Sequence, residues 1–326
     1  MHYVRLGNSN LKISRLSLGT MSFGSPEWRS WTLDLDAARE LVRVALDGGI
    51  NLFDTCNFYS VGRSEDILGT LIEEFGVRDD VIIATKAGYA MRPAATARGF
   101  SRKHLFEQVD ASLRRLKTDY IDLYQTHIWD PATNLEEMVT AFDDLVRSGK
   151  VLYVGATDMP AWQFVKCVTM AKERGLASFV SMQNHYNLAW REDERELIPF
   201  CAAEGIGLLP YSPHARGLLC GRARRTGATQ TERYRTDDYA KAWFGRPADE
   251  AMADLVEEIA GELGMLPSQV ALAWVLSKPA VHSPIIGATR LEHVRDALAA
   301  IDLVLPAEAV QRLEAAYVLR PASGHG

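Results

Sequence analysis

Four polar side chains with complementary acid–base chemistry follow apolar, strand-like segments of the chain. Asp54 and Tyr59 stand in "NLFDTCNFYS", Lys86 in "VIIATKAG" and His127 in "IDLYQTHIW". A tyrosine must overcome a free pKa of about 10 to donate a proton near neutral pH. Lowering that pKa to about 7 needs about 4 kcal/mol, which a lysine cation at about 4 Å supplies at an effective dielectric constant of about 20. The residues therefore predict a site that protonates an oxygen anion while hydride is added to its carbon.

The carboxylate and the imidazole complete this hypothesis, which needs no metal. A buried lysine loses its proton unless a carboxylate holds its charge, and this gives Asp54 a role. His127 can donate a hydrogen bond that orients a carbonyl oxygen. Singly, each residue has a structural alternative, as a helix cap, a solvated charge or a core histidine. Their order at the ends of three successive strands favours the catalytic interpretation.

The elements that would position these residues alternate regularly along the chain. Nearly continuous apolar strands are typical of parallel sheets that are buried on both faces, and helical apolar spacing, as in 105–116, lies between them. Eight such units without a composition break predict one (β/α)8 TIM-barrel domain over 1–326, with its chemistry at the C-terminal strand ends. No GxGxxG motif supports a Rossmann fold instead. The expected strands are 15–20, 51–55, 81–88, 121–129, 152–158, 179–187, 207–213 and 283–289.

Other segments add to this barrel. "YVRLGNSNLKIS" predicts an N-terminal β-hairpin that turns at "GNSN". Two extra helices are expected, at 267–278 and 307–317. Asn134 and Glu137 have the spacing of a capping box that starts a helix. Glycines are expected at helix C-caps, and these are Gly48, Gly149, Gly175 and Gly205.

One connection, residues 214–248, is too long for a plain turn. It follows the seventh barrel strand and therefore lies on the catalytic face. Loops of this length in compact domains are usually functional or disordered. We expect a lid that is mobile until a ligand orders it, with Arg216 or one of the arginines at 222, 224 and 225 near phosphate. The alternative is a permanently ordered excursion whose aromatic side chains pack on the barrel wall.

Composition excludes several other classes of protein. The chain has 326 residues, of which 47% are hydrophobic, and a net charge of −6. The negative charge argues against nucleic-acid or membrane-surface binding, and no apolar run is long enough to span a bilayer. Four scattered cysteines without a CxxC pair, and no signal peptide, favour a cytoplasmic protein with reduced thiols. The oligomeric state is left open.

The motifs "FDTCNFYS", "IATKAG" and "LYQTHIW" resemble those that carry the Asp, Tyr, Lys and His of the aldo-keto reductase superfamily. The resemblance extends from "LGTMSFG" to "PIIGATRLEHV", and is strongest to bacterial reductases of the branch that includes potassium-channel β-subunits. It implies reduction of an aldehyde or ketone by NADPH, with Tyr59 as the acid and a small-molecule carbonyl compound as substrate. It also implies the catalytic set Asp54, Tyr59, Lys86 and His127.

The same resemblance implies a cofactor site along the strand ends. Thr157 and Asp158 stand where the family has a Ser–Asn pair at the nicotinamide amide, and Tyr211 stands at the ring-stacking position. His293 and Ala297 replace a family Gln and Asn at the adenine end. The implied cofactor residues are Gly19, Thr20, Met21, Asp54, Thr157, Asp158, Gln183, Tyr211, Ser212, Arg216, Gly217, Leu218, Gly287, Thr289, Arg290 and His293. For the substrate pocket we expect Phe58, Tyr89 and above all Trp129.

Two other functions are weighed against this one. A Schiff-base aldolase would use Lys86 as its nucleophile, but would not need the residues at Gln183, Tyr211 and Arg290. A nucleotide-sensing subunit would bind the cofactor tightly and turn over slowly while it reports redox state to a partner protein. Borohydride trapping tests the first alternative and turnover measurements test the second.

Overall fold

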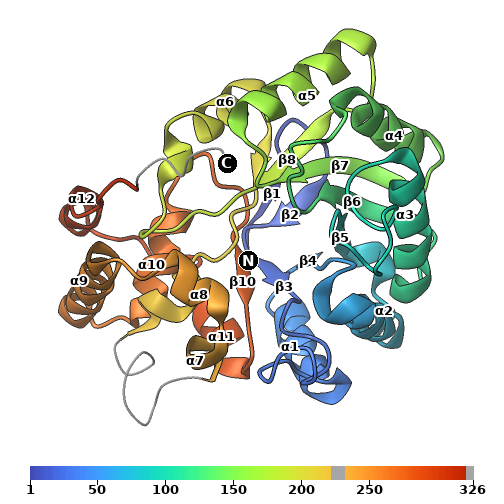
Figure 1. Cartoon of the computed structure of the whole chain (residues 1–326). Coiled ribbons are helices and arrows are strands. Elements are labelled where there is room, and N and C mark those ends of the chain that lie inside the picture. The colour runs from blue at the N-terminus through green and yellow to red at the C-terminus, as the bar shows by residue number, and fades with distance from the viewer. Residues whose placement is uncertain (222–231, 321–326) are drawn as a thin grey trace.

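The computed structural model describes residues 1–221 and 232–320, and its centre is a barrel of eight parallel strands. They are β3 (Ser17–Gly19), β4 (Leu52–Asp54), β5 (Ile82–Ala87), β6 (Ile121–Thr126), β7 (Val151–Thr157), β8 (Phe179–Gln183), β9 (Gly207–Leu208) and β10 (Ile285–Gly287). The sheet order is β10-β3-β4-β5-β6-β7-β8-β9. Figure 1 shows the helices arranged around these strands. The (β/α)8 prediction is confirmed.

The two ends of this sheet approach each other and close the barrel. Isolated parallel bridges pair Leu208 with Val281 and Tyr211 with Ile285. The Ile285 amide donates to the carbonyl oxygen of Pro210 at 2.8 Å. Several strands are shorter than expected. The segment 207–213, for example, keeps only two residues in β9.

The barrel helices follow the strands in the expected order, and both expected extra helices are present. The barrel series comprises α1 (Leu35–Asp47), α2 (Arg63–Phe75), α3 (Arg102–Leu116), α4 (Leu135–Arg147), α5 (Ala161–Arg174), α6 (Leu197–Glu204), α9 (Pro247–Leu263) and α11 (Leu291–Ala299). The extra helices are α10 (Pro267–Leu276) and α12 (Ala307–Ala315). Two short helices, α7 (Glu232–Thr236) and α8 (Asp238–Trp243), were not expected and lie within the long connection.

Helix ends follow the expected chemistry with three differences, one of which is that α4 has Ser148 as its C-cap, with Gly149 one residue beyond it. Asn134 caps α4 by accepting from the amides of Glu136 and Glu137. The Glu137 carboxylate does not complete the capping box, because it accepts from the Arg102 amide at 2.9 Å and so ties α4 to α3. Gly175 and Gly205 adopt the left-handed conformation at the ends of α5 and α6. Gly48 is right-handed, with a φ of −78°, because the positive φ falls on the next residue, Gly49.

The barrel interior changes from apolar to polar along the strands. Because side chains of a strand alternate between its two faces, Leu52 and Asp54 share one face of β4, and Ala84 and Lys86 share one face of β5. At the N-terminal end the hairpin of β1 (Tyr3–Arg5) and β2 (Lys12–Ser14) is expected from "GNSN" and present. Its apolar side chains join Leu52 and other strand residues in a buried cluster. The polar layer therefore lies at the opposite, C-terminal end.

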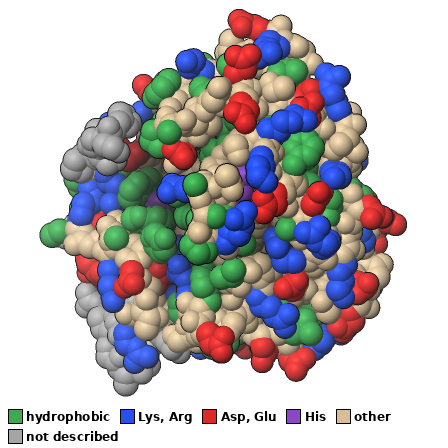
Figure 2. Space-filling model, turned by 45° about the vertical axis from the view of Figure 1, so that its right-hand side comes forward, with side chains coloured by type: hydrophobic (Ala, Val, Ile, Leu, Met, Phe, Trp, Pro, Cys, Tyr) green, Lys and Arg blue, Asp and Glu red, His purple; other side chains and the backbone are tan. Residues whose placement is uncertain are grey.

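The surface carries charges of both signs. Figure 2 shows acidic and basic side chains interspersed on the face that it draws, where hydrophobic side chains also gather beside a hollow. Among the described residues, no single helix has the length and hydropathy to cross a membrane. In the described part of the chain, the pair α9 and α10 meets that test only as two helices together, and they are bent by 98° at their junction.

Candidate active site

A cavity of about 740 Å³ lies at the C-terminal ends of the barrel strands. This volume falls within the range of about 300–1,000 Å³ that is usual for small-molecule and cofactor sites. Asp54, Tyr59 and His127 line it, together with most of the residues expected to hold a cofactor. The barrel thus brings together residues from several separate strands at one rim.

Lys86 lies directly beneath this cavity and is paired with Asp54. Its Nζ donates to Asp54 Oδ1 at 2.6 Å and to the carbonyl oxygen of Thr55 at 2.8 Å. The Lys86 side chain is 0% exposed, and that of Asp54 is 5% exposed. A charged pair taken out of water persists only with good geometry and further hydrogen bonds. Both conditions are met here, so the expected ion pair is present.

Two glutamine amides complete the shell of Asp54. The Nε2 of Gln183 donates to Asp54 Oδ2 at 2.8 Å, and that of Gln125 approaches the same oxygen at 3.4 Å. Gln125 was not singled out from the sequence, although it lies two residues after the core residue Leu123 and so shares its face of β6. The bond to Asp54 uses one of the two Gln183 amide hydrogens, so the other hydrogen and the amide oxygen can still bond a ligand.

The environment of Tyr59 differs from the expectation in one respect. Lys86 Nζ lies 5.4 Å from the centroid of the phenol ring, as a tuning role requires. Nevertheless, burial raises the pKa of Tyr59 well above its usual value, and the nearby Cys56 and Asp54 raise it further. The expected lowering of this pKa is therefore not found. The physical reason is that burial disfavours the charged phenolate, and that Asp54, which pairs with Lys86 at 2.6 Å, adds negative charge beside it.

His127 faces Tyr59 across the cavity as a neutral imidazole. The two rings meet edge to face, with centroids 5.6 Å apart. Burial, and secondarily the Lys86 charge, lowers the pKa of His127 well below its usual value. Its Nδ1 is buried and has no hydrogen-bond partner among the described residues. A neutral imidazole retains one N–H donor, which is what orientation of a carbonyl oxygen requires.

The opposite wall of the cavity carries an aromatic platform. Tyr211 stacks on His185, with centroids 5.0 Å apart and planes 10° from parallel. Its hydroxyl donates to Asp158 Oδ2 at 2.9 Å. Desolvation by the surrounding walls raises the pKa of Asp158 to about 7, although part of its side chain is open to the cavity. Beside it, Thr157 Oγ1 is buried without a hydrogen-bond partner among the described residues.

Arginines dominate the part of the cavity formed by the long connection. Arg216 donates to Asp237 Oδ2 from Nε at 2.9 Å and from Nη2 at 2.6 Å. Arg233 approaches the same oxygen at 3.5 Å and packs its guanidinium over the Trp31 ring. Burial by itself raises the pKa of Asp237. The charges of Arg216 and Arg233 outweigh this effect and hold the pKa below its usual value. Two guanidiniums thus share one carboxylate, which leaves net positive charge in the cavity wall.

These features fit a nicotinamide dinucleotide. The cavity has the required volume, the excess of guanidinium groups suits phosphates, and the orphaned Thr157 hydroxyl can bond an amide. All but two of the residues expected to hold the cofactor line the cavity. Thr20 does not, because it is fully buried and its hydroxyl bonds the Asp54 carbonyl oxygen and Ser64. Leu218 also does not, because it packs in a buried cluster with α9 and α10.

Of the three residues expected in the substrate pocket, two line the cavity and the third does not. Phe58 and Tyr89 line the cavity and stack on each other, with centroids 4.4 Å apart. Trp129 lies outside it, because its ring packs against Phe100 in the outer core. Its position two residues after His127 does not help, since β6 ends at Thr126 and the alternation of faces stops there.

Sequence reasoning missed two basic residues of the cavity wall, Arg29 and Arg233. Arg29 packs on the Trp28 ring at 4.6 Å, and its place between two tryptophans in "WRSW" could have drawn attention to it. Arg233 gives no such signal. In the long connection Tyr239 and Trp243 line the cavity, and Phe244 is buried against His185. The arginines at 222, 224 and 225 lie outside the described residues.

The fold and the cavity define a barrel enzyme with a dinucleotide-sized cleft. A sequence model of the aldo/keto reductase family matches residues 15–318. Versiconal hemiacetal acetate reductase of Aspergillus parasiticus is 40% identical over 339 residues, which cover 98% of this chain and 97% of that protein. A putative aryl-alcohol dehydrogenase of Schizosaccharomyces pombe is 39% identical over 347 residues (99% and 97%), and an aldo-keto reductase of Alternaria alternata is 39% identical over 351 (99% and 93%).

The chain therefore belongs to the aldo/keto reductase family, as the resemblance of its motifs implied, and it reduces carbonyl groups with NAD(P)H. An aldolase that uses Lys86 is disfavoured by the geometry. Its Nζ is fully buried, is held by Asp54 and Thr55, and does not line the cavity.

Proposed function

We propose that this protein is an NADPH-dependent reductase of aromatic aldehydes and ketones, with Tyr59 as the proton donor. The observation that carries the proposal is the buried Asp54–Lys86 pair beneath a tyrosine that lines a dinucleotide-sized cavity. When bound, the cofactor supplies the hydride. Tyr59 holds the proton until a substrate oxygen takes it, in keeping with its raised pKa.

Each of the other catalytic residues has a distinct role in this proposal. His127, as a neutral imidazole, donates to the carbonyl oxygen and sets its direction toward Tyr59. Lys86 stabilises the phenolate that remains after proton transfer, and Asp54 keeps Lys86 charged while buried. As the proton leaves Tyr59, the cation gains a partner of opposite charge, so the pair stabilises the transition state more than the resting site.

The substrate end of the cavity supports an aromatic substrate. Phe58 and Tyr89 form a stacked pair, and Trp28 meets Phe58 edge to face with centroids 6.3 Å apart. Planar rings favour offset-stacked and edge-to-face partners. One relative, the putative aryl-alcohol dehydrogenase of Schizosaccharomyces pombe, is named for the same substrate class.

The preference for NADPH rests on Arg290 and Thr289, which line the cavity at the start of α11. An exposed guanidinium there can bond the 2′-phosphate that NADH lacks. Residues 1–326 are proposed to act as one domain. The proposed kinship with the branch that includes potassium-channel β-subunits rests on the motifs alone, since the relatives described above are fungal reductases and dehydrogenases.

A substrate panel tests the proposal directly. Purified protein is assayed with NADPH or NADH and with benzaldehyde, 4-nitrobenzaldehyde, acetophenone and an aliphatic aldehyde of equal carbon number. Loss of reduced-nicotinamide absorbance is followed. We expect turnover with NADPH, fastest on the aromatic aldehydes. Tight NADPH binding with turnover below about one per minute on every compound would instead support a nucleotide-sensing subunit.

A further inference from the structure

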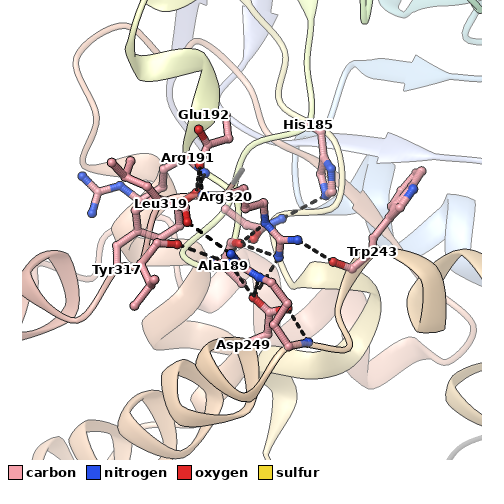
Figure 3. A network of polar contacts seen from close by, with 12 residues as sticks. His185, Ala189, Arg191, Glu192, Trp243, Asp249, Tyr317, Leu319 and Arg320 are labelled. Atoms are coloured by element: carbon pink, nitrogen blue, oxygen red, sulfur yellow. Dashed lines mark hydrogen bonds and ion pairs between the residues drawn. The ribbon is translucent and has the colours of Figure 1, made fainter. Parts of the chain in front are cut away.

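Arg320, near the C-terminal end of the described chain, joins four separate segments. Its guanidinium donates to the carbonyl oxygen of Ala189 from Nε at 3.1 Å and Nη2 at 3.0 Å, and to that of Trp243 from Nη1 at 2.7 Å. Nη2 also bonds Asp249 Oδ1 at 2.8 Å. The Arg320 amide donates to Glu192 Oε1 at 2.7 Å. Figure 3 shows Arg320 in the middle of these partners, between the β8 loop, α8 and α9.

The same guanidinium is the outer end of a stack of rings that reaches the cavity. Its Cζ lies 4.3 Å from the Trp190 ring centroid. Trp190 stacks on His185 at 4.7 Å with a 27° interplanar angle, and His185 stacks on Tyr211 at 5.0 Å. Tyr211 presents its ring to the cavity as the proposed nicotinamide platform. An Arg–Trp–His–Tyr stack thus leads from the C-terminal segment to the cofactor.

Arg320 also fixes the element that flanks this stack. The Trp243 carbonyl oxygen that it binds is at the end of α8, and the Trp243 ring packs on His185 at 4.9 Å and lies 6.5 Å from Tyr211. Burial lowers the pKa of Arg320, but Asp249, only 1% exposed, supports its charge. A guanidinium is planar, so it can stack on Trp190 and bond carbonyl oxygens in its own plane at once. A lysine at this position could not do both.

We propose that Arg320 is a positioning residue for the nicotinamide end of the cofactor site. It acts through the Trp190–His185 stack, which sets the plane of Tyr211, and through Trp243, which closes the stack from the side. The inference rests on the proposed cofactor site and adds that the C-terminal segment determines its geometry. A side chain at position 320 that only attached the C-terminal segment would not be sufficient. The position requires a planar cation that also stacks on Trp190.

Arg246 provides a matched control for attachment. It binds the same carboxylate, Asp249, at 3.0 Å, and the same segment through the carbonyl oxygens of Val318 and Leu319 at 3.3 Å. No ring of the stack is among its contacts in the described part of the chain. Loss of Arg246 therefore loosens the C-terminal segment and leaves the stack in place.

The experiment compares R320Q, R320K and R246Q in the full-length protein. Binding of NADPH and of adenosine 2′,5′-bisphosphate, which lacks the nicotinamide, is measured by tryptophan fluorescence quenching or calorimetry, with Tm as a stability control. We expect R320Q and R320K to raise the Kd for NADPH at least fivefold and the Kd for the bisphosphate less than twofold. R246Q should change neither Kd more than twofold at a comparable loss of Tm.

Three outcomes overturn the proposal. They are an unchanged NADPH Kd in R320Q, equal losses for both ligands, or a loss in R246Q as large as in R320Q. If R320Q does not fold, W190L interrupts the stack without removing the polar contacts and should show the same ligand selectivity; equal losses in W190L also refute the proposal. Failure of the proposed function is distinguishable, because it appears as absent NADPH binding in the wild-type protein.

Discussion

The Asp54–Lys86 pair makes a prediction about folding stability that can be worked through in numbers. D54N removes the carboxylate charge and leaves Lys86, fully buried, with only neutral partners. Breaking a buried pair in this way typically costs about 3–5 kcal/mol. The loss in unfolding free energy also has an independent upper limit, because the buried lysine can release its proton instead of staying charged. With an ordinary lysine pKa of about 10.4, neutralisation at pH 7 costs about 4.6 kcal/mol, so the loss in unfolding free energy should lie between about 3 and 4.6 kcal/mol.

The pH dependence of this loss identifies its cause. If Lys86 is neutral in folded D54N but charged in the unfolded chain, the unfolded state binds one more proton. The unfolding free energy of the variant then rises with pH by about 1.4 kcal/mol per unit relative to wild type. Between pH 7 and 9 the deficit should shrink by about 2.7 kcal/mol. If the Thr55 carbonyl oxygen is enough to keep the lysine charged in D54N, the deficit should instead stay the same between pH 7 and 9.

Urea unfolding followed by circular dichroism at pH 7, 8 and 9 measures both quantities. The matched control is D110N, which breaks an ion pair with Lys150 of similar length, 2.7 Å, whose side chains are 45% and 38% exposed. Exposed pairs contribute under about 1 kcal/mol, so D110N should show a small loss without a pH slope. A second variant, D54N/K86M, should regain stability without regaining reductase activity. A D54N loss below about 1 kcal/mol, or one independent of pH, refutes the reasoning.

Four further predictions concern function and pH. Y59F should lower kcat at least about a hundredfold with the NADPH Kd nearly unchanged, and retention of more than a tenth of kcat excludes Tyr59 as the acid. R290A should raise the Kd of NADPH far more than that of NADH; equal losses would assign it a structural role. Residues 214–221 and 232–248 should exchange amide hydrogens faster without NADPH than with it, and unchanged exchange removes the lid hypothesis. Burial raises the pKa of Asp158 to about 7, so the carboxyl group of the folded protein stays protonated up to about that pH. At higher pH the group carries a charge that the folded state disfavours. D158N should therefore increase urea stability more at pH 8 than at pH 5, and the opposite order contradicts this assignment.

Much of the barrel and of the catalytic layer could be predicted from local patterns. Two residues on one strand face need only an even spacing, so Asp54 falls in line with Leu52 and Lys86 with Ala84. Parallel strands then bring their C-terminal ends to one rim. This is why residues from three motifs, far apart in the sequence, could be assigned to one site before any contact was known.

The local sequence pattern did not predict side-chain contacts where a strand ended or where a loop folded back on the barrel. Trp129 was expected in the substrate pocket from its spacing to His127, but β6 stops at Thr126 and the ring turns to Phe100. Arg216 was expected at phosphate, and in the free protein it bonds Asp237, 21 residues later in the chain. Spacing carries no information about such contacts, since loop geometry determines them.

By itself, the sequence determined the order of strands and helices, the family, and the identity of the residues at the barrel rim. The reason is that side-chain alternation and helical periodicity are properties of short segments. Only the tertiary structure decided how those residues behave. The direction of the Tyr59 pKa shift depends on burial and on the nearby Cys56 and Asp54. The Arg320 stack joins the C-terminal segment to the loop after β8 and to Tyr211 after β9. Contacts between residues so far apart in the sequence exist only once the chain has folded.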